Sequence, residues 1–235
     1  MADFFAAALG EVDRAPDPPR AFCEVFRNVF PVSGAAVSTL GEVMGSETLA
    51  ASSTQAARLD ELQFDLGEGP CWDAMTTGKP VLQPDIAGSG RTRWPSFSDS
   101  LASEGVSSVF AFPLGVGPLR FGAIDLYSID RVLLDDTQTR HATAMADVVS
   151  RHVLRRAIAS VGIEPDDSGS AFSRRLVHQA TGMVLAQINV SADDALLVIE
   201  GHAFAAGRPM MEVAQEIIGG RLRFSRRAGR IEVDR

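Results

Sequence analysis

The histidines and cysteines are the side chains of this sequence most suited to catalysis or metal binding. They are His141, His152, His178 and His202, all on predicted helices without a motif partner, and Cys23 and Cys71, each among apolar or aromatic neighbours. The sequence has no phosphate-binding loop of the Walker type, no nucleophile elbow, no zinc-protease motif and no paired cysteines. We therefore expect no catalytic residues, no metal site and no cofactor.

The binding of phosphate is the chemistry that the C-terminal residues favour. Arg174, His178 and Thr181 are spaced four and three residues apart, so a helix would place them on one face. That face is expected to lie away from the apolar stripe Phe172–Leu176–Ala180. Arg208 precedes a later helix, and the end of the chain carries a run of arginines: Arg221, Arg223, Arg226, Arg227 and Arg230. The alternative interpretation is an ordinary solvated helix face followed by a disordered end.

The charge distribution is uneven along the chain. Residues 1–170 carry 13 basic and 23 acidic side chains, a net charge of −10, whereas residues 171–235 carry nine arginines and seven acidic side chains, a net charge of +2. A phosphate-rich partner should therefore meet the C-terminal part. No apolar run has the length of a membrane span, the apolar patch at residues 1–9 lacks a basic segment, and two cysteines make no disulfide framework. These features predict a cytoplasmic protein with no membrane partner.

Helices and strands alternate irregularly in the first two thirds of the chain. The patterns predict helices over 18–30 and 55–63 and strands over 34–40, 46–51, 107–114 and 120–128. A long helix follows over 135–160, with an apolar stripe of Ala142, Met145, Val149 and Val153. We expect this stripe to pair with a second copy and so to form a homodimer. Residues 162–169 have the composition of a linker.

Four segments of this first part resemble the GAF family. They are LDELQFDLGEGPCWDAMTTGKPVLQP at 59–84, RWPSF at 93–97, GVSSVFAFPL at 105–114 and RFGAIDLYS at 120–128. The resemblance implies an antiparallel sheet flanked by helices, with a small-molecule pocket on one face of the sheet. By position, the ligand pocket should include five aromatic residues: Phe64, Trp72, Trp94, Phe97 and Phe112. The alternative is that these aromatics only fill the core and that the domain serves as a dimerisation module.

The last third is expected to fold as three short helices. The first covers about 171–187, the second begins after a capping serine, Ser191, and the third begins near Pro209 and ends at Gly219. The motifs SRRLVHQATG, SADDAL, GRPM and EVAQEII make this region similar to the ANTAR family over its whole length. The family implies a three-helix RNA-binding domain that acts in transcription antitermination. Thr181 stands where the family usually has lysine. Gly182 lies within a helix, where glycine is unfavourable, and we therefore expect a neighbouring element to approach the helix closely at this position.

Together these features predict an α+β GAF-like sensor domain at 18–158, a linker at 159–170, an all-α ANTAR-like domain at 171–222 and a basic tail at 223–235. The predicted function is a signal-responsive antitermination regulator that binds hairpin RNA in nascent transcripts. The predicted RNA-binding residues are Arg174, His178, Thr181 and Arg208, and a small, largely apolar molecule is the expected ligand of the first domain, because its candidate pocket is rich in aromatic residues. A DNA-binding regulator is one alternative, although the polar side of the third helix holds only Glu212, Gln215 and Glu216. A signalling scaffold without a nucleic-acid partner is the other.

Overall fold

The computed structural model describes residues 7–8, 10, 18–41, 44–160, 174–227 and 229–234. The chain divides into two compact units, Met1–Phe172 and Ser173–Arg235, which we call the N-terminal and the C-terminal domain. The predicted linker at 159–170 lies almost entirely outside the described residues, as does Phe172.

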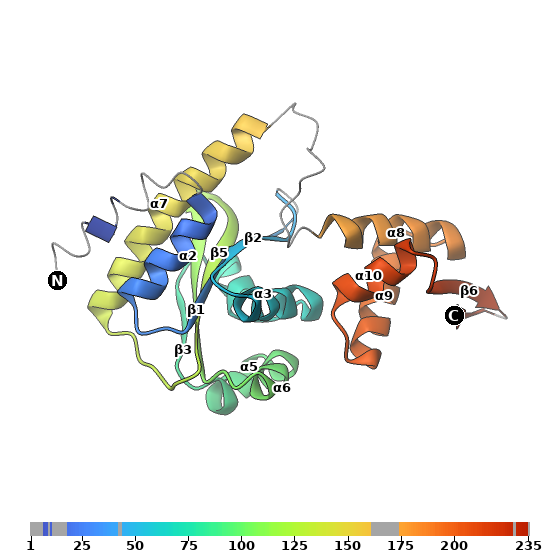
Figure 1. The fold of residues 1–235 in the computed structure, drawn as a ribbon, viewed down its shortest axis with the longest axis horizontal. Coiled ribbons are helices and arrows are strands. Elements are labelled where there is room, and N and C mark those ends of the chain that lie inside the picture. The colour runs from blue at the N-terminus through green and yellow to red at the C-terminus, as the bar shows by residue number, and fades with distance from the viewer. Residues whose placement is uncertain are drawn as a thin grey trace. The chain divides into compact units, whose positions relative to one another are not determined.

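The N-terminal domain is built on a five-stranded antiparallel sheet between two layers of helices (Figure 1). The strand order is β2-β1-β5-β4-β3. The strands are β1 (Gly34–Thr39), β2 (Glu47–Ala51), β3 (Val81–Gln83), β4 (Ser108–Val116) and β5 (Leu119–Ser128). Strands β4 and β5 form the hairpin that the sequence predicts, joined by a tight turn at Gly117, where φ is +60°. The expected flanked antiparallel sheet is therefore confirmed.

Helices cover both faces of this sheet. Helices α2 (Pro18–Val29) and α7 (Asp136–Ser160) pack on one face. The other face is covered by α3 (Thr54–Leu66), α4 (Pro70–Thr77) and α6 (Pro95–Ser103), together with the short π-helix η1 (Ile86–Gly90) and α5 (Arg91–Arg93). Because side chains alternate along a strand, Phe110 and Phe112 of β4 point toward α2 and α7, whereas Val109 and Ala111 point toward the α3 layer.

The apolar stripe of α7 is buried within its own domain. Ala142, Met145 and Val149 are fully buried and Val153 is 5% exposed, and all four pack into the core beneath α2 and the sheet. The prediction that this stripe pairs with a second copy is therefore wrong, because the sheet face and α2 already cover it. Figure 1 shows the C-terminal end of α7 continuing past the sheet.

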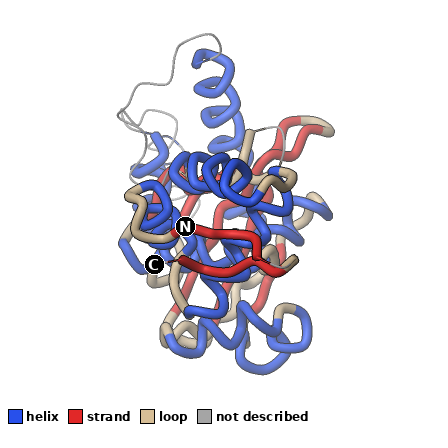
Figure 2. Tube along the Cα trace, turned by 90° about the vertical axis from the view of Figure 1, so that its right-hand side faces the viewer, coloured by secondary structure: helices blue, strands red, loops and turns tan. Residues whose placement is uncertain are grey.

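The C-terminal domain contains three helices and a two-stranded ribbon. The helices are α8 (Arg175–Ile188), α9 (Ala192–Ala206) and α10 (Met210–Ile218), and the ribbon consists of β6 (Arg223–Arg227) and β7 (Arg230–Asp234) (Figure 2). Ser191 caps α9 as predicted, since its Oγ accepts a hydrogen bond from the amide of Asp194 at 3.1 Å. The expected basic tail is thus a folded ribbon.

Gly182 was expected to permit close approach of a neighbouring element. A Cβ atom built on it meets nothing within 4 Å, and the residue is exposed. That expectation is wrong, because the side of α8 that carries Gly182 faces away from the core of the described domain.

No single helix of the described residues is long and apolar enough to cross a membrane. Helices α8 and α9 reach that threshold only when taken as a pair, and they are bent by 106° at the break between them.

Candidate functional site

A cluster of polar side chains is buried beneath α3, against the sheet. Asp60 of α3 is fully buried and accepts a hydrogen bond from Ser38 Oγ at 3.3 Å and a shorter one from Thr48 Oγ1. Asp125, in the middle of β5, is also fully buried. We call Asp60 and Asp125 the buried carboxyl pair. Two carboxyl groups without water around them are costly to keep charged together.

Asp125 lacks hydrogen-bond partners of normal geometry on both carboxyl oxygens, and so do the hydroxyl of Tyr127 and the side-chain Nε2 of Gln63. Burial, and then the charge of Asp60, raise the pKa of Asp125 well above its usual range, and Gln63 partly offsets this. Burial and the charge of Asp125 likewise raise the pKa of Cys71. The cluster is therefore suited to holding a proton or to meeting a polar group that supplies hydrogen bonds.

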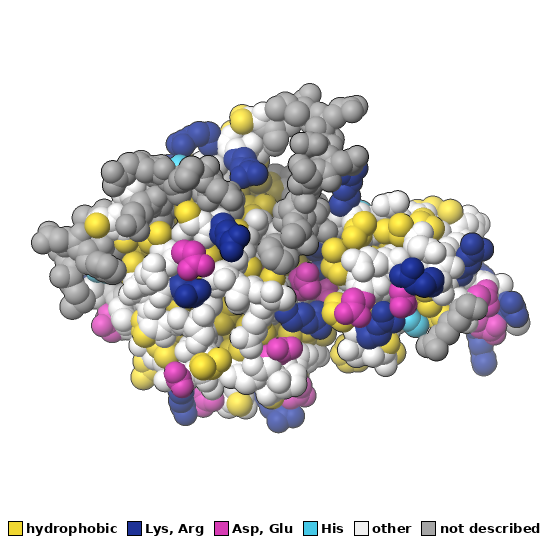
Figure 3. Space-filling model, viewed as in Figure 1, with side chains coloured by type: hydrophobic (Ala, Val, Ile, Leu, Met, Phe, Trp, Pro, Cys, Tyr) yellow, Lys and Arg dark blue, Asp and Glu magenta, His cyan; other side chains and the backbone are white. Residues whose placement is uncertain are grey.

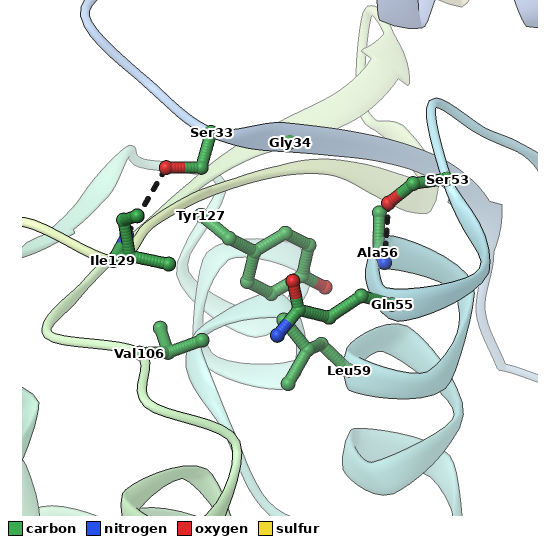
Figure 4. Close-up of a pocket in the computed structure, with 9 residues that line it drawn as sticks. All are labelled: Ser33, Gly34, Ser53, Gln55, Ala56, Leu59, Val106, Tyr127 and Ile129. Atoms are coloured by element: carbon green, nitrogen blue, oxygen red, sulfur yellow. Dashed lines mark hydrogen bonds between the residues drawn. The ribbon is translucent and has the colours of Figure 1, made fainter.

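A small cavity at the surface is lined by one member of this cluster, Tyr127 (Figure 4). Tyr127 lies at its centre, with Leu59 and Val106 beside the ring and Gln55 across from it. The cavity is small. Its volume of about 10 Å³, counted as the space in which the centre of a water molecule can lie, holds about one water. A larger ligand therefore requires α3 or the adjoining loops to move.

The five aromatic residues predicted to form a ligand pocket do not line this cavity. Trp94 and Phe97 pack in the core under α3 and α6, and Phe64 packs beside Cys71 with the half-buried Trp72. Phe112 lies in the core on the opposite face of the sheet. Strand alternation thus separates Phe112 from the other four predicted pocket residues.

Asp60, Gln63, Asp125 and Tyr127 were missed by the sequence reasoning. The segment RFGAIDLYS does contain a signal, since Asp125 interrupts an apolar strand that is buried on both faces. A charged residue in such a strand is rare without a specific reason. Asp60 gives no comparable signal, because an aspartate is ordinary on an amphipathic helix.

In the C-terminal domain, the predicted strip of Arg174, His178 and Thr181 does not form one exposed face. Arg174 is 7% exposed, with Nη2 3.3 Å from Sδ of Met210. Thr181 is 9% exposed, and its hydroxyl donates to the carbonyl of Val177 at 2.8 Å. The core stripe of α8 runs through Val177, Ala180, Val184 and Ile188. Because positions 174 and 181 fall at helical spacing from Val177, they share its buried face, and His178 alone of the three is exposed.

Arg208 is half-buried at the start of α10 and is held by two carboxylates. Its Nη1 and Nη2 donate to the two carboxylate oxygens of Glu216 at 3.0 Å each, and its Nε donates to Glu212 at 3.3 Å. The hydrogen bonds that Arg208 donates to Glu216 raise the pKa of Arg208 above its usual value. Arg208 together with its two carboxylate partners therefore presents no net positive charge to an RNA ligand.

Comparison with known proteins agrees with the two-domain organisation. Residues 20–153 match the GAF domain model, and residues 171–218 match the ANTAR domain model. The chain has no match among curated proteins.

Among solved structures, the fold is similar to the GAF domain of a phosphoenolpyruvate-protein phosphotransferase from Coxiella burnetii, with 12% identity and a TM-score of 0.54, over 68% of this chain and 96% of that one. A GAF domain from the Acinetobacter phosphoenolpyruvate-protein phosphotransferase is similar at 11% identity and a TM-score of 0.53, over 69% and 97% of the two chains. A domain of a two-component sensor histidine kinase protein from Sinorhizobium meliloti is similar at 14% identity and a TM-score of 0.51, over 64% and 98%. At these identities the similarity shows the fold.

GAF domains are sensor domains and ANTAR domains are RNA-binding regulatory domains. The model match to the first covers more than half of the chain, and the match to the second covers all three helices of the C-terminal domain. The protein therefore belongs to the GAF domain family and carries an ANTAR domain after its GAF domain.

Proposed function

We propose that this protein is a signal-responsive transcription antitermination regulator, in which the GAF domain controls the binding of hairpin RNA by the ANTAR domain. The observation that carries the proposal is the presence of a GAF fold and a complete ANTAR match in one chain. Binding would stabilise an antiterminator hairpin in a nascent transcript, in the cytoplasm. The protein would act as a regulator and not as an enzyme.

The signal is proposed to be a small polar molecule that opens the GAF core beneath α3. The support is a group of buried polar side chains that lack hydrogen bonds of normal geometry, Asp125, Tyr127 and Gln63, of which Tyr127 lines a small cavity at the surface. Burying such atoms without hydrogen bonds costs free energy, and a ligand that satisfies them recovers part of it. Native mass spectrometry of protein purified from its natural host should show a bound small molecule.

A DNA-binding regulator is a weaker candidate. On α10, the residues outside the core are mostly acidic or neutral, including Glu212, Gln215 and Glu216. A recognition helix in a major groove needs side chains that read base edges without repelling phosphates. The surface of α10 does not supply them.

The decisive experiment is a gel-shift titration of the full chain with a stem–loop RNA and with a DNA duplex of the stem sequence. The proposal expects retention of the RNA and weaker or no retention of the duplex. Preference for the duplex would favour a DNA-binding regulator. Absence of binding to both at low salt would favour a protein scaffold.

A further inference from the structure

The helical part of the ANTAR domain carries no excess of positive charge. Residues 174–220 contain three arginines against five carboxylates, a net charge of −2. Of these arginines, Arg174 is buried, Arg208 is bound by Glu212 and Glu216, and Arg175 is exposed. Binding of nucleic acid depends on positive charge near phosphates. If the domain binds RNA, another element must provide that charge.

The β6–β7 ribbon provides it. Residues 221–234 contain five arginines against two carboxylates, a net charge of +3. The ribbon lies beyond Ile218, where the match to the ANTAR model ends. Figure 3 shows Lys and Arg side chains with acidic side chains among them at the end of the C-terminal domain where Figure 1 draws β6.

The strand register separates the ribbon into two faces. Phe224 pairs with Val233, and Arg226 with Ile231, on one face; Phe224 is buried against the helices, whereas Arg226, Ile231 and Val233 are exposed. Arg223, Arg227 and Arg230 occupy the opposite face together with Glu232 and Asp234, because side chains alternate along a strand, so this face carries three arginines against two carboxylates. All three arginines are exposed. We call Arg223, Arg227 and Arg230 the arginine face.

The arginine face contains an unfavourable pair. Arg227 and Arg230 lie directly opposite each other in the register, and like charges in that position destabilise a sheet. Arg227 has two carboxylate neighbours, Glu232 at 3.9 Å and Asp234 at 3.6 Å, but it is 68% exposed, so these ion pairs are weak. Within the described residues, Arg223 and Arg230 have no ion pair. An anionic ligand would relieve the repulsion between the arginines.

The ribbon is fixed to the helices rather than hanging free. Leu222 is 3% exposed and Phe224 is 4% exposed, and both belong to the core of the three helices. The amide of Phe224 donates to Gln187 Oε1 at 2.9 Å, and its ring meets His202 edge-on at 5.7 Å between centroids. The arginines are therefore held in place, which lowers the entropy lost when they bind.

We propose that the arginine face of the β6–β7 ribbon is the phosphate-binding surface of this protein and that its ligand is the backbone of the hairpin RNA. This inference rests on the proposed function, which supplies the RNA partner. The ribbon thus supplies the positive charge for phosphate binding that the helices, with their net negative charge, lack. It contacts phosphates and leaves the reading of bases to the exposed side of α8, where His178 lies.

The test is a salt series of gel shifts on the full chain with one stem–loop RNA. The variant Arg223→Gln/Arg230→Gln removes two charges from the arginine face, and the control Arg151→Gln/Arg156→Gln removes two exposed charges from α7. The ribbon variant should lose roughly tenfold or more in affinity at low salt, and its log–log salt slope should fall by about 1.4–1.8, two contacts' worth. The control should keep the wild-type slope. Circular dichroism should show unchanged folding of both, since all four side chains are exposed.

The outcomes separate the two proposals. If wild type binds the RNA and the ribbon variant keeps its affinity and slope, the phosphates are bound elsewhere and this inference is overturned. If wild type binds no RNA at low salt, the proposed function fails and the ribbon loses its proposed partner. A parallel arm uses vesicles of phosphatidylserine and phosphatidylcholine. Ribbon-dependent binding to these vesicles without RNA binding would overturn the inference in favour of a membrane surface.

Discussion

The buried carboxyl pair of the GAF domain decides how stability depends on pH. The folded-state pKa of Asp125 is raised by burial and by Asp60, whereas an unfolded aspartate titrates near about 3.9. The contribution of Asp125 to stability is therefore fully present below the unfolded value and is lost as the pH rises through the folded value. Asp125→Asn should raise the free energy of unfolding near neutral pH by on the order of 1–3 kcal/mol and flatten its pH dependence.

Thermal unfolding measured from acidic to alkaline pH tests both effects. Asp147→Asn, at an exposed position on α7, is the matched control and should change neither. A variant at Asp125 that is less stable than wild type at neutral pH would show that the carboxylate is charged and satisfied in the folded protein.

Arg208 offers a second test at the level of single residues. Its guanidinium is bound by two carboxylates, Glu216 and Glu212, so removing one of them takes this group from a net negative charge to neutrality. If Arg208 contacts RNA, Glu216→Gln should strengthen binding and steepen the log–log salt slope by about 0.7–0.9. Asp193→Asn, an exposed site on α9, makes the same charge change. Equal effects of the two variants would mean that Arg208 lies away from the RNA.

Gly182 lies inside helix α8 and affects the stability of that helix. No atom lies within 4 Å of a Cβ added to Gly182, and glycine inside a helix costs about 0.5–1 kcal/mol relative to alanine. Gly182→Ala should therefore stabilise the ANTAR domain by about that amount in calorimetry of the full chain. Gly122→Ala should do the opposite to the GAF domain, because its Cβ would lie 2.1 Å from the carbonyl oxygen of Ser38. A destabilised Gly182→Ala variant would point to a close contact made by the glycine in solution.

The attachment of the β6–β7 ribbon depends chiefly on one aromatic side chain. Phe224 fills the end of the three-helix core, and replacing a buried phenylalanine with alanine typically costs about 3–5 kcal/mol. Phe224→Ala should lower the unfolding temperature of the ANTAR domain and weaken RNA binding while keeping all arginines. Ile231→Ala, at a position 44% exposed, should change stability by less than about 0.5 kcal/mol. Equal stability of the two variants would show that the ribbon is not anchored through Phe224.

At the scale of the whole molecule, we expect a homodimer. The stripe Ala142, Met145, Val149 and Val153 is unavailable for pairing, but α7 continues beyond the sheet to Ser160, and Ile158 near its end is 64% exposed. Light scattering should give a dimer mass for wild type and a monomer mass for Ile158→Glu. Leu133→Glu, an equally apolar position that is 76% exposed in a loop, should remain dimeric. A monomer mass for wild type at every concentration would contradict pairing through α7.

Much of the architecture was predictable from local sequence. The hairpin of β4 and β5, the cap at Ser191 and the three helices of the C-terminal domain were all indicated by turn residues, capping residues and apolar periodicity. These signals act between residues that are near in the chain, so they remain visible without the fold. Motif resemblance added the family of each domain, which the matches to both models confirm.

The sequence alone determined the elements and the families, whereas the tertiary structure decided which side chains are available for binding. Arg174 and Thr181 looked like surface residues because their types are polar, but the packing of α8 turns them into the core. Asp60 and Asp125 come from segments far apart in the chain and meet beneath α3 only when the sheet forms. The arginines at the C-terminus became one face only through the pairing of β6 with β7. The physical reason is the same in each case, since burial and juxtaposition depend on contacts between distant segments, which no local pattern encodes.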